Sequence, residues 1–361
     1  MLRGIKLIDL FIAFKFLYMF LAVFVIARLT KLGDTELYLN SSIPFSLKGL
    51  FISTDLIIYL VRIIKLVFRL DIIVHFFFCI TSIVGIIYPL KKLSLSKRNY
   101  RLLFFLLMLP SFGIWTSIVG KDALGAYAIG IIIGKLIDYS NKGKIKYDFL
   151  LCSALYLLAV LKPQYFIALV NIFFLIFLNK KVKDKLVWGI IVISQIVFCV
   201  AVLLYFSDTI DQLARMMEQH FSLSSNTTRQ NQFWLEKNDF FKKIPIGFYL
   251  SFVGPSLSEV NNLLTLSAFI ESWIIIIVMT FIVSEKLIIR ISLGKLHVRN
   301  IYMYFSTVFW IMLVHYPFGL LNPGSANRYR SNFIHFIIIM GFVIFNQLYY
   351  EGRDLKRIYG K

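Results

Sequence analysis

The chain has 361 residues, of which 59% are hydrophobic, and its mean hydropathy is +0.77. Soluble domains are only about half apolar, so this composition excludes a soluble globular protein. The net charge of +20 comes from lysines and arginines in short segments between apolar runs. That placement excludes a nucleic-acid-binding module and is typical of cytoplasmic loops. We therefore expect an all-α, polytopic membrane protein with one multi-pass domain over residues 1–361.

About ten segments approach the ~20 apolar residues that a helix needs to cross a bilayer. The first is 7–27, where we expect the Lys15 side chain to extend toward the cytoplasm. The others are 72–90, 102–118, 123–136, 149–161, 165–178, 186–206, 263–283, 301–320 and 333–349.

The segment 47–70 is apolar enough to span, yet it contains Asp55 and the basic residues Arg62, Lys65 and Arg69. The three basic residues recur at helical spacing, which favours an amphipathic helix lying in the membrane interface. A true span is the alternative.

Basic residues in short loops indicate the cytoplasmic side. With ten spans and an interfacial 47–70, the basic clusters all fall on one side, and both termini are cytoplasmic. These clusters are 91–101, 142–146, 180–185, 286–299 and 353–361. The opposite face then collects the chain's other polar motifs, including the long loop 207–262.

Asp34 and Glu36 lie in GDTELY, just beyond the first span. Two carboxylates here could deprotonate a sugar hydroxyl or hold a divalent cation that bridges phosphates. An ordinary solvated loop is the alternative. Whether a metal ion binds here, and through which residues, stays an open question.

The string PSFGIWTSIVGKD joins two spans through a tight outer turn that holds Trp115, Lys121 and Asp122. Lys121 could neutralise a lipid-linked phosphate that Asp122 orients, or the two could form an ion pair at a helix start. Trp115 could stack on a sugar or lie in the aromatic belt. Lys162, at another outer turn, would be a second cation beside a pyrophosphate.

NPGSANRYR, residues 322–330, is the most specific string of the chain. A turn at its glycine and serine could form an anion-binding nest, while Arg328 and Arg330 fork onto phosphate oxygens. The alternative is a loop whose arginines contact lipid headgroups. The loop 207–262 contains Arg215 and Arg229, a mixture suited to carbohydrate, and a helix near 209–219 that could act as a lid.

The strings GDTELY, PSFGIWTSIVGKDAL, LKPQYF and NPGSANRYR, in this order between spans, resemble the Wzy-like polymerases of bacterial surface polysaccharides. The layout is also similar to the GT-C type of membrane glycosyltransferase. The resemblance extends over most of the chain and consists of the layout of the segments and these short strings. Asp34-Thr35-Glu36 is a relaxed form of the paired-acid motif.

This resemblance implies transfer of a growing glycan from one undecaprenyl pyrophosphate carrier to the next lipid-linked repeat unit, as in O-antigen or capsule synthesis. The reaction would occur at the outer face of the bacterial inner membrane. Asp34 would orient or deprotonate the acceptor, and Lys121, Lys162, Arg328 and Arg330 would stabilise the departing pyrophosphate. The partners would be lipid-linked glycans and membrane lipids, and a chain-length regulator could also bind. A divalent cation could take part in the reaction; no other cofactor is expected.

Two other functions remain as alternatives. A GT-C transferase that moves one sugar from a polyprenyl-phosphate donor would use the same face. A lipid-linked oligosaccharide flippase is disfavoured because transporters place charges along a midplane path and often have repeated halves.

Overall fold

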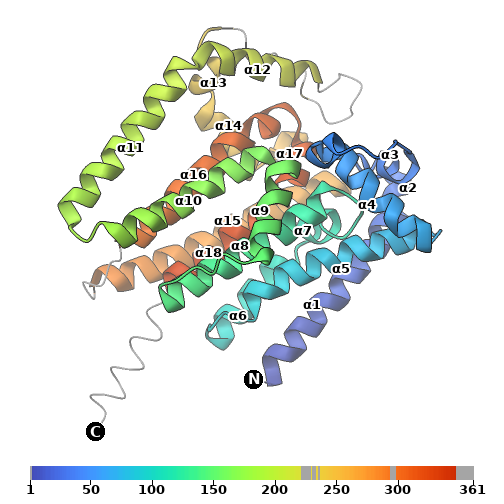
Figure 1. Cartoon of the computed structure of the whole chain (residues 1–361), viewed down its shortest axis with the longest axis horizontal. Coiled ribbons are helices and arrows are strands. Elements are labelled where there is room, and N and C mark those ends of the chain that lie inside the picture. The colour runs from blue at the N-terminus through green and yellow to red at the C-terminus, as the bar shows by residue number, and fades with distance from the viewer. Residues whose placement is uncertain (1, 221–228, 230–232, 235, 293–297, 347–361) are drawn as a thin grey trace. The chain divides into compact units, whose positions relative to one another are not determined.

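The computed structural model describes residues 2–220, 229, 233–234, 236–292 and 298–346 (Figure 1). These residues form helices joined by turns, and no strand occurs among them, which confirms the all-α class. The chain divides into two compact units. Unit 1 comprises Met1–Phe166, Ile274–Leu296 and Arg330–Lys361, and unit 2 comprises Ile167–Trp273 and His297–Tyr329. The basic cluster 353–361 lies outside the described residues.

The first half of the chain contains α1 (Leu2–Leu21), η1 (Ala22–Ile26), α2 (Ala27–Leu29), α3 (Thr35–Asn40), η2 (Lys48–Phe51), α4 (Ser53–Val67), α5 (Asp71–Leu90), α6 (Lys97–Leu107), α7 (Pro110–Trp115), α8 (Lys121–Lys142) and α9 (Phe149–Leu161). The second half contains α10 (Pro163–Lys181), α11 (Lys185–Tyr205), α12 (Ser207–His220), α13 (Asp239–Lys242), α14 (Ile244–Phe252), η3 (Leu257–Glu259), α15 (Leu263–Ser292), α16 (Val298–Leu321), α17 (Pro323–Arg330) and α18 (Ile334–Asn346).

Seven helical segments among the described residues are long and apolar enough to cross a membrane, and an eighth is added if α17 and α18 form one broken span. These helices support a membrane-embedded chain, although the sequence predicts about ten spans. The segment 102–118 accounts for part of the difference: α6 ends at Leu107 and α7 begins at Pro110, because proline cannot continue a helix. The helix α9 has 13 residues, fewer than a full crossing needs.

Lys15 lies near the middle of the first span, Lys6–Leu29. Its side chain is buried, and Nζ donates to Oγ1 of Thr116 at 2.6 Å. The expectation that Lys15 extends to the cytoplasm is therefore wrong. A hydroxyl deep inside unit 1 satisfies the amine instead of water.

The segment 47–70 contains α4, which has 15 residues and is too short for a full crossing. One side of α4 is buried in unit 1, while Ile63, Leu66 and Val67 are 61%, 85% and 73% exposed. The exposed side at this end of α4 is apolar, so the division does not test the expected amphipathic helix. Its location in the membrane interface stays a prediction.

Only two of the three basic residues of this segment lie on α4. Arg62 donates to the carbonyl of Ile43, and Lys65 Nζ donates to the carbonyl of Leu39 at 2.7 Å. Arg69 lies beyond the end of α4 at Val67. The three-residue stripe is therefore wrong, because the helix stops before its last member.

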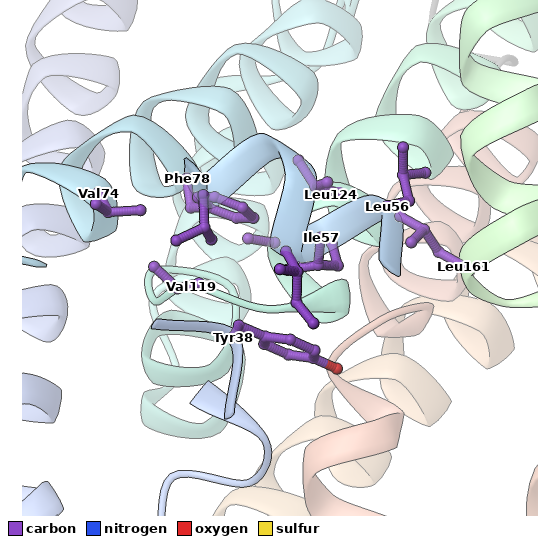
Figure 2. Packing of buried hydrophobic residues seen from close by; sticks show 11 residues of the cluster. Tyr38, Leu56, Ile57, Val74, Phe78, Val119, Leu124 and Leu161 are labelled. Carbon is purple, nitrogen blue, oxygen red and sulfur yellow. The ribbon is translucent and has the colours of Figure 1, made fainter. Parts of the chain in front are cut away.

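A cluster of buried side chains, called here the α4 core, joins α3, α4, α5 and α8 (Figure 2). Figure 2 shows Leu56 of α4 beside Leu161 at the end of α9, and Tyr38 of α3 next to Ile57. The cluster consists of Tyr38, Leu56, Ile57, Ile58, Val61, Val74, Phe78, Val119, Ala123, Leu124 and Leu161. It fixes the start of α8 against α3, α4, α5 and the end of α9.

The helices α5 and α8 pack with their main chains in contact. A Cβ atom added to Gly130 would lie 2.2 Å from the Gly85 carbonyl oxygen, and one added to Gly85 would lie 2.3 Å from the Cα atom of Tyr127. Small residues allow such close approach between apolar helices, where van der Waals contact replaces the hydrophobic effect.

Unit 2 contains a second pair of packed helices, α14 and α16. A Cβ atom added to Gly319 would lie 2.1 Å from the Oγ atom of Ser251, and Ser251 Oγ donates to the carbonyl of Tyr316 at 3.1 Å. The helix expected at 209–219 is present as α12. The sequence did not predict α14, an apolar helix that makes 207–262 more than a hydrophilic loop.

We predict that Gly130→Ala lowers the stability of the protein by about 1–3 kcal/mol, because the added methyl group has no space against α5. The measurement is the midpoint of thermal unfolding in detergent. Gly189→Ala on α11 is the control, since a Cβ atom there meets nothing within 4 Å. Equal midpoints for the two variants would contradict the close packing.

Candidate functional site

The segment 116–120, between α7 and α8, is buried although it is not helical. Three elements hold it. Lys15 of α1 donates to Thr116, Thr35 of α3 donates through Oγ1 to the Val119 carbonyl at 2.9 Å, and the Val119 N–H donates to Nδ1 of His75 on α5 at 3.1 Å. Buried main-chain groups need partners, so these side chains replace a regular helix or sheet.

The local sequence ends α7 at this point. The hydroxyls of Thr116 and Ser117 donate to the carbonyls of Phe112 and Gly113, each at 2.5 Å. Hydroxyls that bond the carbonyl four residues back satisfy the last turn of a helix. The chain is then free to turn into α8 at Lys121.

Asp122 and Lys162 form a buried ion pair at the start of α8. Lys162 Nζ lies 3.0 Å from Oδ1 of Asp122, and the two side chains are 5% and 3% exposed. Asn332 Nδ2 donates to the same oxygen at 3.0 Å. The structure thus joins two predicted site residues that are forty positions apart, and each charge is neutralised within the protein.

Space for this contact comes from Gly125, one turn into α8. A Cβ atom at Gly125 would lie 2.9 Å from Oδ1 of Asn332. A larger residue would push Asn332 away from Asp122.

Lys121 points away from this pair toward α4. Its Nζ donates to Oγ of Ser53 at 2.9 Å and to Oγ1 of Thr54 at 3.2 Å. Successive helical residues are rotated by about 100°, so Lys121 and Asp122 have different neighbours. An ammonium group and two hydroxyls therefore meet where α4 and α8 both begin.

Asp34 and Glu36 are exposed at the start of α3. The Tyr38 hydroxyl donates to Oδ2 of Asp34 at 3.4 Å. Thr35, between the two acids, is buried and bonds Val119, which brings Asp34 to the same end of unit 1 as Lys121. Among the described residues, no group of three or more His, Cys, Asp or Glu side chains could hold a metal ion.

Trp115, at the end of α7, is half-buried against an apolar cluster of Ala22, Leu32 and Ile118. This contact gives the indole a packing role. Its predicted contact with a sugar stays a prediction.

The string NPGSANRYR does not form the expected anion-binding turn. It forms α17, whose start is capped by Oδ1 of Asn322, which accepts from the Ser325 N–H at 2.9 Å. Pro323 takes the first helical position, where its missing N–H costs nothing. The nest prediction is wrong because asparagine and proline together begin a helix.

Arg328 and Arg330 are two positions apart on α17, so their side chains leave the helix about 200° apart. The Arg328 guanidinium lies 5.6 Å from the ring centroid of Tyr329, and Arg330 is buried. The predicted contact of these two arginines with phosphate oxygens stays a prediction.

Arg229, another predicted substrate-binding residue, is bound inside unit 2. It donates to both carboxylate oxygens of Glu259, at 2.5 and 2.9 Å, and to the carbonyls of Gly319 and Leu320. Arginine suits this bidentate geometry. These hydrogen bonds satisfy carbonyl groups in the last turn of α16, which gives Arg229 a structural role. Arg215 is exposed on α12.

Burial raises the pKa of Glu259, but the hydrogen bonds from Arg229 and Ser256 outweigh this effect and hold the pKa below its usual 4.5. A carboxyl group with a lowered folded pKa contributes stability above its unfolded pKa, and this contribution disappears as the pH falls through the folded value.

Sequence reasoning missed Thr35, Ser53, Thr54, His75 and Asn332. Asn332 is a polar residue at the start of an apolar run, which is a signal that could have been used. Thr35, Ser53, Thr54 and His75 lie in no local sequence pattern that indicates a role, because their roles depend on contacts between distant segments.

This chain matches no protein-family model, no curated protein and no solved structure. The assignment of function therefore rests on the sequence and on the geometry described above.

We predict that Asp122→Asn and Lys162→Met each destabilise the protein by about 3–5 kcal/mol, because each leaves one buried charge uncompensated. The double variant should recover part of this loss. Thermal unfolding in detergent measures all three. Lys237→Met is the matched control, since it breaks an ion pair with Asp208 whose side chains are 69% and 71% exposed. Strictly additive single effects would disprove the pairing.

We also predict that Glu259→Gln costs about 1.5–3 kcal/mol at pH 7, the value of hydrogen bonds to a charged group. The difference from the wild type should shrink as the pH falls below 4.5 and on through the lower folded pKa, because protons bind first to the unfolded and then to the folded carboxyl group. Unfolding midpoints in detergent between pH 7 and pH 3 measure it. A difference that is constant across this range would refute the lowered pKa.

Proposed function

We propose that this chain is a membrane glycosyltransferase that polymerises lipid-linked glycan repeat units at the outer face of a bacterial inner membrane. The observation that carries the proposal is the meeting of Lys121 with the hydroxyls of Ser53 and Thr54 at the starts of α4 and α8. The exposed Asp34 belongs to the same end of unit 1. This combination suits transfer from a phosphate-activated sugar.

The cation and hydroxyls supply recognition of an anion. Ammonium and hydroxyl groups donate to phosphate oxygens, and the first N–H groups of a helix add positive potential. In the proposed reaction, negative charge grows on the undecaprenyl pyrophosphate as it leaves, and preorganised donors stabilise this charge best.

The carboxylate supplies the base. The acceptor hydroxyl oxygen would attack the anomeric carbon of the donor glycan, and the bond from that carbon to the pyrophosphate oxygen would break. Asp34 would take the proton from the acceptor hydroxyl. Its exposure at the start of α3 is compatible with an incoming substrate.

Asp122 and Lys162 have a different role in this proposal. Because both are buried and bonded to each other, we assign them to positioning. They fix the first turn of α8, and so hold Lys121 in place. Asn332 supports the same turn.

The GT-C layout is part of the proposal. It is supported by the all-helical fold, by the seven or eight possible spans and by polar residues at the ends of helices in unit 1. A single-sugar GT-C transferase would use the same chemistry, and the experiment below distinguishes it.

The test is the glycolipid profile of a host that lacks this gene. Surface lipid with only one repeat unit supports the polymerase. A truncated repeat unit would instead identify a single-sugar transferase, and complete repeat units retained on the cytoplasmic face would identify a flippase.

Within this assay, we predict that Lys121→Ala lowers polymer about 100-fold or more, the usual effect of removing one transition-state donor. Asp34→Asn should have a comparable effect. Lys48→Ala, at an exposed lysine of η2, is the matched control and should give wild-type polymer. Wild-type polymer from Lys121→Ala, with normal insertion of the protein, would remove the proposed anion site.

A further inference from the structure

The helix α12 has three distinct sides. Residues three or four positions apart share one side of a helix. Asp211, Ala214 and Glu218 form the side that faces unit 2. Asp208, Gln212 and Arg215 form an exposed polar side, and Thr209, Leu213 and Met216 form an exposed side that is mostly apolar.

The inner side of α12 is firmly attached to a later segment of unit 2. Asp211 accepts hydrogen bonds from the N–H groups of Asn238, at 2.7 Å, and Phe240, at 3.4 Å. Glu218 accepts from the Phe233 N–H at 2.9 Å. Carboxylate acceptors make strong hydrogen bonds with main-chain donors, so α12 belongs to the folded body of unit 2.

The apolar outer side is left uncovered by this attachment. Leu213 is 55% exposed and Met216 is 63% exposed. Neither residue is needed for the contact with 233–240, which the inner side makes.

The chain before α12 indicates what covers these residues. The helix α11 is a possible membrane span that ends at Tyr205, and only Phe206 separates it from α12. Tyr205 and Phe206 are 83% and 50% exposed, and aromatic residues of this kind are enriched at the membrane surface. In Figure 1 the chain turns sharply from α11 into α12.

We propose that α12 lies in the membrane interface, with Thr209, Leu213 and Met216 against the lipid and with Asp208, Gln212 and Arg215 toward water. The three-sided pattern matches the three surroundings of a helix at this place: protein, acyl chains and solvent. The proposal makes α12 a fixed interfacial helix, whereas its sequence suggested a lid. It does not depend on the enzymatic proposal.

The test uses the full chain in vesicles of phosphatidylcholine and phosphatidylglycerol, with Cys79, Cys152 and Cys199 replaced by alanine. Single cysteines then replace Leu213, Met216, Gln212 and Arg215, one at a time, and carry an NBD fluorophore. Nitroxide-labelled lipid quenches fluorophores in the bilayer, and iodide quenches those in water.

We expect lipid nitroxides to quench the labels at 213 and 216 several-fold more than those at 212 and 215, and iodide to show the opposite order. The two polar positions are matched controls, because they lie on the same helix and are also exposed. Iodide quenching at all four positions would overturn the proposal in favour of an aqueous lid. Shielding of 213 and 216 from both quenchers would overturn it in favour of contact with another protein surface.

Discussion

The buried ion pair between Asp122 and Lys162 is the interaction on which the architecture of unit 1 most depends. Two opposite charges with 3% and 5% of their side chains exposed are tolerable only if each neutralises the other. The pair ties the first turn of α8 to the residue just before α10, and Asn332 adds the segment before α18. Three distant parts of the chain must therefore be in place together, and the position of Lys121 follows from theirs.

Around this pair, unit 1 replaces regular structure with side-chain hydrogen bonds. The Val119 main chain is bonded on one side by Thr35 and on the other by His75. Apolar contacts of the α4 core lie directly beside these bonds. The segment 116–120 is buried, and each unsatisfied main-chain group would cost several kcal/mol in apolar surroundings. A buried chain that turns from one helix into the next within a few residues has few other ways to satisfy its main-chain groups.

The sequence predicted the class of the protein well and its contacts less well. Hydropathy alone indicates helices that could span a membrane. Asp122 and Lys162 do come together, and each stands at or just before the start of such a helix. The failures share one cause. Lys15 and Arg229 carry charges that usually contact solvent, whereas here Thr116 and Glu259 from distant positions satisfy them. NPGSANRYR has turn composition, yet Asn322 and Pro323 also form a good helix start. Local composition leaves such choices open, and tertiary contacts decide them.

The contact of α5 with α8 also limits how unit 1 can move. Where the Gly85 and Gly130 main chains touch, neither helix has a side chain that can change rotamer and absorb a small displacement. At Gly134 the ring of Tyr88 lies equally close to α8, since an added Cβ atom there would lie 2.3 Å from Cδ1 of Tyr88. Close-packed interfaces of this kind shift in discrete steps or not at all. The two helices should therefore move as a single rigid body, and any opening that admits the proposed lipid-linked substrate has to arise in elements other than this pair.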